Sequence, residues 1–190
     1  MNDIRINTLE HLKYVDPAKV IPQLTEVMTL AAVSNLPDKV KNLRTNKLRR
    51  HRERWIAALF CYGQSRLLNT PIFVSPYEAS DYDAVSKWYQ NNTLYYAPIQ
   101  IKEVISEDLN PYTGINQEIA KLEKYTSSQD LVVVIYVNRN ERLEVPKVIV
   151  PKLNISQLWI MGACVPDLTK WFIAGDFLKK TSIFIFDYPF

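Results

Sequence analysis

Glycine is scarce in this chain of 190 residues, which contains only Gly63, Gly114, Gly162 and Gly175. Neither a GxGxxG nor a GxxxxGK[ST] pattern can be built from glycines at these positions. Both patterns use glycine backbone to approach phosphate groups closely, in dinucleotide-binding folds and in P-loops respectively. The sequence therefore argues against a nucleotide site formed by a glycine-rich loop.

Cysteine and histidine are rarer still, with two of each. Cys61 and Cys164 lie in apolar surroundings far apart in the sequence, which predicts free core thiols in a protein from a reducing compartment. A four-cysteine zinc site is excluded, and the two histidines form no HxxxH motif. A thiol-protease pair of Cys61 with His11 or His51 is the weaker interpretation, because a thiol within ALFCYG is typical of a buried, inert side chain.

Long apolar runs are missing as well. The longest, residues 131–137 and 183–186, are far shorter than the ~20 residues that a membrane-spanning helix needs. The opening sequence MNDIRINTLEHLKY has no apolar stretch of the kind found in signal peptides. We therefore expect a cytoplasmic protein with no membrane partner.

What the chain does have is ordinary globular composition and one concentrated block of positive charge. Hydrophobic residues make up 47% and charged residues 23%, and the length suits one domain. Residues 39–54 carry eight basic residues and one acid, or +7, while the rest of the chain carries 15 basic and 19 acidic residues, or −4. Such a block suggests contact with a polyanion, and a solvated helix face is the alternative. The candidate phosphate contacts are Lys47, Arg49, Arg50, Arg52 and Arg54.

Periodicity and turn residues predict an α/β fold with a mixed central sheet flanked by helices. We expect residues 1–44 to form an N-terminal helical and basic extension, and residues 45–190 to form the α/β domain. Helices are expected at about 22–34 (with Pro22 in the first turn), 45–68, 115–125 and 155–164, and strands at about 72–75, 81–88, 94–104, 131–137, 148–150, 171–174 and 183–186. The two strands around Asn91 form a hairpin, and the helix at 115–125 makes a βαβ crossover to the apolar strand LVVVIYV.

The side chains that could take part in catalysis are concentrated on the predicted hairpin. Strand alternation places Gln100 and Lys102 on one face of its second strand, and Asp81 and Asp83 on one face of its first. A glutamine and a lysine among apolar neighbours need polar partners, which acids on the adjacent strand or a divalent cation would supply. The Asp83 carboxylate, the Gln100 amide oxygen and the backbone carbonyl of Ile101 are hard oxygen ligands suited to Mg²⁺. Lys102 would then lie one step away, placed to orient an attacking water.

Glu53 lies on a predicted helix, Asp83 on the predicted hairpin and Gln100-x-Lys102 on the second strand of that hairpin. A helix and an apolar strand follow. This order of elements and residues resembles the PD-(D/E)XK nuclease superfamily. The resemblance covers residues 45–138, and INQEIAKLEKY is similar to the helix that follows the motif in that superfamily. It implies a restriction-endonuclease-like core. It also implies Glu53, Asp83, Gln100 and Lys102 as catalytic residues. Gln100 stands where the family usually has Glu or Asp, although some active members carry Gln there.

Two choices among acids stay open at this point. Asp83 and Asp81 are both candidates for the motif aspartate and metal ligand, and Asp83 is favoured because it lies further into the predicted strand. Asp81 is also typical of a loop end. Glu53 is favoured over Glu78 as the helical acid, because its position follows the core-facing side of its helix, whereas Glu78 lies in a loop. For Glu53 the alternative is a surface ion pair with Arg49, four residues earlier.

The function expected from these features is metal-dependent cleavage of nucleic acid, most consistently DNA, with Mg²⁺ or Mn²⁺ as cofactor. The alternative is a nuclease fold without catalysis, acting as a nucleic-acid or protein adaptor. A third interpretation has the basic block contact an acidic protein. The C-terminal FIFDYPF is aromatic enough to form the edge strand of a homodimer, or to fold back onto its own domain.

Overall fold

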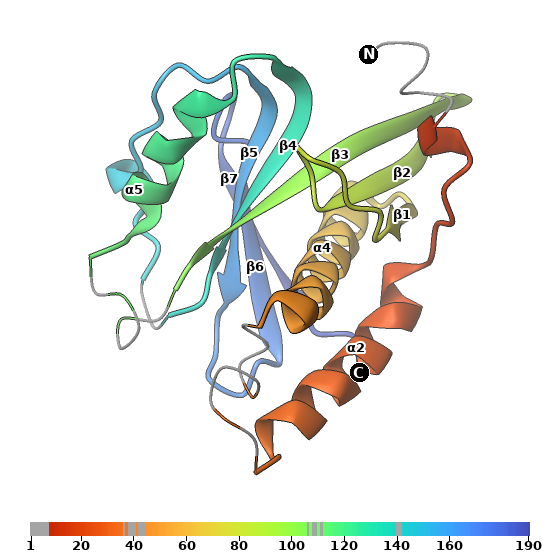
Figure 1. Ribbon diagram of the computed structural model, residues 1–190. Helices are drawn as coiled ribbons and strands as arrows, with labels where there is room; N and C mark the ends of the chain where they lie inside the picture. The colour runs from red at the N-terminus through yellow and green to blue at the C-terminus, as the bar shows by residue number, and fades with distance from the viewer. Residues whose placement is uncertain are drawn as a thin grey trace. The chain divides into compact units, whose positions relative to one another are not determined.

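The computed structural model describes residues 8–35, 37, 41, 45–105, 107, 110, 112–139 and 142–190 (Figure 1). Seven strands of these residues form one mixed sheet in the order β1-β2-β3-β4-β5-β6-β7. The chain divides into two compact units, one up to Ala97 with Pro189–Phe190 and one of Pro98–Tyr188, so that β3 (Thr93–Val104) contributes to both. The predicted α/β class with a mixed sheet is confirmed. The predicted boundary at residue 44 and the restriction-endonuclease-like core stay predictions.

The first unit begins with helix α2 (Pro17–Ala32). Asp16 caps it by accepting a hydrogen bond from the Ala18 amide at 3.0 Å, and Pro17 occupies the first turn, where its missing N–H costs nothing. The prediction of a helix from about residue 22, with Pro22 in the first turn, is therefore wrong. Pro22 lies inside the helix, on an exposed position, and the Asp16-Pro17 pair was the stronger start signal.

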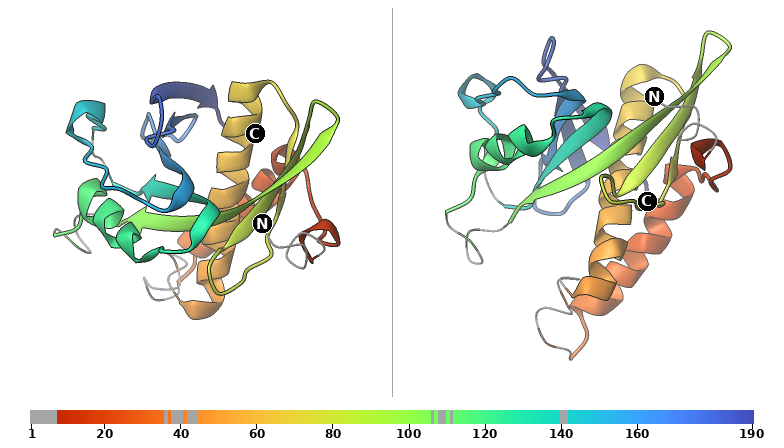
Figure 2. Two further views of the ribbon diagram at one scale, coloured as in Figure 1. Left: turned by 90° about the horizontal axis from the view of Figure 1, so that it is seen from above. Right: turned by 45° about the horizontal axis from the view of Figure 1, so that its top comes forward.

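Helix α4 (Asn46–Leu68) confirms the predicted helix of residues 45–68. It ends at Asn69, whose left-handed backbone conformation (φ 48°, ψ 42°) is one that asparagine tolerates well. The stretch from Trp55 to Cys61 is buried on every side. The Trp55 indole donates to the Thr25 hydroxyl at 3.2 Å, and α2 and α4 lie side by side (Figure 2).

Strands β1 (Ile72–Ser75) and β2 (Ala84–Gln90) pair antiparallel. β2 turns into β3 through Asn91 and Asn92, whose φ angles of 49° and 59° suit the tight two-residue turn that joins hairpin strands. The predicted strand at 72–75 and the predicted hairpin are confirmed.

In the second unit, β3 runs parallel to β4 (Ser128–Val137), with α5 (Ile115–Ala120) and the short 3₁₀ helix η1 (Lys121–Lys124) between them. Residues 131–137 of β4 are all buried, as expected for a strand without polar alternation. The predicted crossover from strand through helix to parallel strand is confirmed.

The C-terminal part of the second unit corrects two predictions. Residues 155–164 were expected to form a helix, but β5 (Ile155–Ala163) is a strand parallel to β4. Its run of apolar residues is buried along the strand, and such a run carries no period that separates a helix from a strand. Residues 148–150 are not a strand, and a 3₁₀ turn, η2 (Val145–Lys147), precedes them. β6 (Lys170–Gly175) and β7 (Ser182–Asp187) confirm the strands expected at 171–174 and 183–186, and the structure pairs them antiparallel.

Both cysteines are free thiols, as predicted, but only one belongs to the core. Cys61 is fully buried on α4, and burial raises the pKa of its thiol, which keeps it protonated and inert. Cys164 is exposed, so its prediction as a core thiol is wrong, because it follows the end of β5 rather than lying on a helix. In the part of the chain that the structure describes, no helix has the length and apolar character needed to cross a membrane.

Candidate active-site residues

Glu53 and Asp83 form an acidic pair in the first unit. Glu53 lies on α4 with its side chain 16% exposed, and Asp83 is the last residue before β2. Burial raises the pKa of Glu53 to about 7, and the neighbouring negative charge of Asp83 contributes further. The Arg49 guanidinium, whose Nε lies 3.1 Å from Glu53 Oε1, opposes both effects on this pKa. The two carboxylates therefore stand close enough to repel each other in a poorly solvated place.

The prediction that Asp81 and Asp83 share a strand face is wrong, because β2 begins only at Ala84. Both aspartates lie on the bend that leads into the strand, and both are half-buried. The preference for Asp83 over Asp81 keeps a physical basis in its electrostatic interaction with Glu53, which raises the pKa of that glutamate.

Glu78 also lies in this neighbourhood. It contributes to the raised pKa of Glu53, and its Oε2 lies 2.7 Å from Nε of Arg50. Arg49 thus pairs with Glu53, and its neighbour on α4, Arg50, pairs with Glu78. These are the two glutamates between which the sequence left a choice. The expected ion pair of Arg49 with Glu53 is present together with the Asp83 interaction, so the two interpretations of Glu53 are compatible.

The predicted phosphate contacts on α4 do not form one uniform face. Arg49 and Arg50 are exposed, whereas Arg52 and Arg54 are half-buried. Arg50 and Arg54 are one helical turn apart and share a side of the helix, while Arg49 and Arg52 lie on the side of Glu53. The backbone of Lys47 lies in α4, and its side chain is outside the described residues.

Gln100 and Lys102 form a second pair, in the second unit. Strand β3 places both side chains on one face, as predicted, and both are half-buried. Tyr125, directly after η1, meets both of them. Its hydroxyl donates to Gln100 Oε1 at 3.4 Å, and the Lys102 ammonium lies 5.8 Å from the centre of its ring. The Gln100 amide nitrogen donates to the Ile101 carbonyl at 3.4 Å.

The structure adds residues that the sequence interpretation missed. Tyr125 is one, and its signal was an aromatic residue at the end of the helix text INQEIAKLEKY. Another contact occupies the opposite face of β3, where Glu103 Oε1 accepts a hydrogen bond from Asn138 at 2.8 Å. Because this contact links β3 to the residue after β4, we assign it to fastening the parallel strands rather than to the candidate site.

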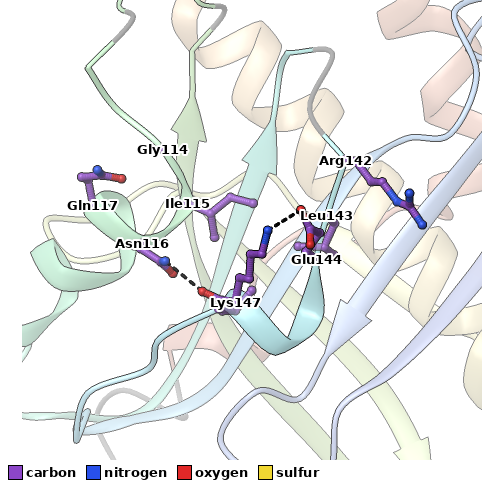
Figure 3. Close-up of a pocket in the computed structure, with 9 residues that line it drawn as sticks. Gly114, Ile115, Asn116, Gln117, Arg142, Leu143, Glu144 and Lys147 are labelled. Carbon is purple, nitrogen blue, oxygen red and sulfur yellow. Dashed lines mark hydrogen bonds and ion pairs between the residues drawn. The ribbon is translucent and has the colours of Figure 1, made fainter.

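A shallow pocket of about 200 Å³ lies elsewhere in the second unit, between the start of α5 and residues 142–148 (Figure 3). Asn116 joins the two sides: its amide nitrogen donates to the Lys147 carbonyl at 3.0 Å, and its oxygen accepts from the Ile149 amide at 2.9 Å. Lys147 pairs with Glu144 at 2.9 Å. These contacts attach the segment to α5, which is a structural role.

The first pair, Glu53 and Asp83, is the candidate for metal binding. Among the described residues, no three side chains of His, Cys, Asp or Glu are grouped so that they alone could hold a metal ion. Mg²⁺, however, commonly takes one or two carboxylates and completes its shell with water and substrate phosphate oxygens. The chemistry of Glu53 and Asp83, two repelling hard-oxygen donors, fits such an ion.

Within its own unit, each pair is brought together: Glu53 with Asp83, and Gln100 with Lys102. Comparison of the chain with protein-family models, with curated proteins and with solved structures finds no match in any of the three. The relationship to the PD-(D/E)XK nucleases therefore stays a prediction drawn from the residues of this chain.

Proposed function

We propose that the chain is a metal-dependent nuclease that hydrolyses phosphodiester bonds in nucleic acid, with DNA as the expected substrate and Mg²⁺ or Mn²⁺ as the cofactor. The observation that carries the proposal is the placement of Glu53, whose side chain is 16% exposed on α4 and feels the negative charge of Asp83; burial first, and that charge second, raise its pKa. A divalent cation held by the Glu53 and Asp83 carboxylates would favour their ionised forms and offset their repulsion.

The second pair supplies the remaining roles. Gln100 offers an amide oxygen, and the Lys102 ammonium is held near the Tyr125 ring. We assign to Lys102 the orientation of the attacking water and the stabilisation of negative charge on the phosphate in the transition state. When bound, the metal would polarise the phosphate and lower the pKa of a coordinated water. The exposed arginines of α4, Arg49 and Arg50, would contact phosphates of the substrate.

A cleavage assay on the full chain tests the proposal. Purified protein should cut DNA with Mg²⁺ or Mn²⁺ and should not cut it in EDTA. Lys102→Ala should lower the cleavage rate at least about 100-fold. Lys124→Ala is the matched control, because the Lys124 ammonium lies 5.4 Å from the centre of the same Tyr125 ring, and it should keep its activity. Undiminished cleavage by Lys102→Ala would reject the assignment.

A second candidate function is a nuclease-like adaptor that binds nucleic acid without cutting it. One observation favours it: both ends of the Gln100 amide already have hydrogen-bond partners, in Tyr125 and in the Ile101 carbonyl. This candidate predicts salt-dependent DNA binding without metal-dependent cleavage. The same assay, run beside a binding titration at two salt concentrations, separates the two functions.

A further inference from the structure

Tyrosines are concentrated in the first unit, beside the acids of the candidate site. Five of them, which we call the tyrosine row, are Tyr77, Tyr82, Tyr14, Tyr96 and Tyr89. Tyr77 directly precedes Glu78, and Tyr82 directly precedes Asp83. One end of the row therefore lies in the chain next to two of the acids that surround Glu53.

Ring contacts and electrostatic interactions connect the members of the row. The ring centroids of Tyr77 and Tyr82 lie 6.2 Å apart, and those of Tyr14 and Tyr96 lie 5.9 Å apart. Burial raises the pKa of the Tyr14 hydroxyl, and the hydroxyls of Tyr96 and Tyr82 raise it further. Tyr14 thus interacts with a member of each ring pair, and the four side chains form one group.

The far end of the row lies on the β2–β3 hairpin. The two-residue turn of this hairpin places Lys87 of β2 opposite Tyr96 of β3, and strand alternation places Tyr89 on the same face as Lys87. Burial, and then Glu10 and Tyr89, raise the pKa of Tyr96. One face of the hairpin therefore presents two tyrosines and a lysine.

Tyr14 comes from the segment ahead of α2, and several contacts hold this segment against the sheet. The Tyr14 hydroxyl donates to the Leu9 carbonyl at 2.8 Å. The next residue, Val15, exchanges two backbone hydrogen bonds with Val74 of β1, at 2.9 and 3.0 Å (Figure 1). The Lys87 ammonium lies 4.3 Å from the centre of the Tyr14 ring. The ring is therefore fixed in place, which lowers the entropic cost of binding a ligand against it.

The two ends of the row are open to solvent. Tyr89 is 61% exposed and Tyr77 is 40% exposed, whereas Tyr82 is buried behind Tyr77. Tyr14 and Tyr96 are half-buried. Within each ring pair the planes are tilted by 42° or 43°, so the rings do not close against each other face to face. Aromatic surface is thus available to a flat ligand at both ends of the row.

We propose that the tyrosine row binds the unpaired bases of a single-stranded nucleic acid, with bases stacked on Tyr77 and Tyr89; this inference rests on the proposed function and adds the single-stranded form of the substrate. Unpaired bases stack on aromatic side chains, whereas duplexes are bound mainly through their phosphates, which require cations. The row contributes five aromatic rings with one nearby lysine, Lys87. Its chemistry therefore suits bases, and the exposed arginines of α4 are the phosphate contacts.

Fluorescence anisotropy with the full wild-type chain tests the proposal. The labelled probe is an oligothymidylate of about 12 nucleotides, and the buffer contains EDTA so that binding is measured without cleavage. An abasic strand of the same length has the same phosphates and no bases. Wild type should bind the oligothymidylate at least about fivefold more tightly than the abasic strand. Y77S/Y89S should weaken oligothymidylate binding at least roughly tenfold without changing its salt dependence, because tyrosine rings neutralise no phosphates.

Two further variants serve as controls. Y77F/Y89F keeps both rings and should bind as wild type. Y95S removes a tyrosine that is 41% exposed on the opposite face of the hairpin, where its ring stacks on Trp88 with centroids 5.4 Å apart, and it should leave binding unchanged. Because Tyr77 and Tyr89 are exposed, Y77S/Y89S should unfold at the same urea concentration as wild type.

Equal affinity for the oligothymidylate and the abasic strand, or full affinity in Y77S/Y89S, would overturn the proposal. Tighter binding of a proline-rich peptide to the same tyrosines would overturn it too, by showing a different occupant. An oligouridylate probe separates RNA from DNA, and tyrosine-dependent binding of either strand supports the proposal. Tyrosine-dependent binding without metal-dependent cleavage would reject the nuclease and keep the row. Cleavage of duplex DNA without tyrosine-dependent binding would reject the row and keep the nuclease.

Discussion

Glu53 in the first unit and Lys102 in the second occupy opposite electrostatic situations. Glu53 lies half-buried beside another carboxylate, and the effects that raise its pKa outweigh the ion pair with Arg49 that lowers it. The Lys102 ammonium lies 5.8 Å from the centre of the Tyr125 ring, whose electron-rich face attracts a cation. An added cation would offset the negative charge around Glu53, whereas the surroundings of Lys102 already attract the cation of its own side chain. We therefore assign the divalent ion of the proposed function to the acidic pair of the first unit.

The largest effect expected from this comparison comes from Asp83→Asn. Removing this negative charge should lower the pKa of Glu53 and remove one metal carboxylate, so metal-dependent cleavage should fall at least about 100-fold. Mn²⁺ binding, measured by electron paramagnetic resonance of the free ion, should weaken in parallel. Asp81→Asn is the matched control on the same bend. An equal loss with both variants would contradict the preference for Asp83.

A pH titration of stability comes next in size. Because the fold raises the pKa of Glu53 from 4.5 to about 7, the native metal-free protein keeps a proton that the unfolded chain releases within that pH window. The free energy of unfolding should therefore fall as pH rises from about 4.5 to about 7. Glu53→Gln should remove this fall and stabilise the protein by about 1–2 kcal/mol at pH 8, after allowance for solvent screening. Urea unfolding of the wild type and of Glu53→Gln at several pH values measures this free energy. The same pH slope in both proteins would show that Glu53 is well solvated.

A smaller effect is expected in the second unit from Tyr125→Phe. The hydrogen bond to Gln100 is long at 3.4 Å, so its loss should cost less than about 1 kcal/mol of stability. If Tyr125 orients the Gln100 amide for the reaction, kcat should nevertheless fall a few-fold with KM for DNA unchanged. Tyr112→Phe, at a tyrosine that is 87% exposed, is the control. A change in KM alone would place Tyr125 in substrate binding instead.

The smallest effect on stability should come from Arg50→Ala. The Arg50 side chain is 63% exposed, and ion pairs of this kind contribute about 0–1 kcal/mol. DNA affinity should fall, and the slope of log affinity against log salt should decrease by about one if Arg50 contacts a phosphate. Lys19→Ala, at an exposed position of α2, is the control. An unchanged salt slope would remove Arg50 from the nucleic-acid surface.

Most elements of the fold were predictable because each carries a local signal. The helix at residues 45–68, the turn at Asn91 and Asn92, and the apolar strand LVVVIYV are examples. The failure at 155–164 has a physical reason: ISQLWIMGAC is apolar along most of its length, and burial on both faces removes the alternation that identifies a strand. Asp83 was placed inside a strand because the start of β2 depends on its pairing with β1.

The candidate site, like the fold, was predictable from the sequence only in part. That Gln100 and Lys102 share a face follows from strand alternation alone, so it was predictable. Tyr125 was not, because its contact with them depends on how the segment after α5 returns to the sheet.

The amino-acid sequence was enough to infer the class of fold, the order of most helices and strands, and the kinds of chemistry available. These properties depend on neighbouring residues, whose spacing is set by the covalent chain. The folded arrangement was needed to show that Asp83 acts on Glu53, that arginines of α4 pair with Glu53 and Glu78, and that Ile183 and Ile185 are exposed. Contacts between distant segments depend on how whole elements pack, and no local pattern encodes that packing.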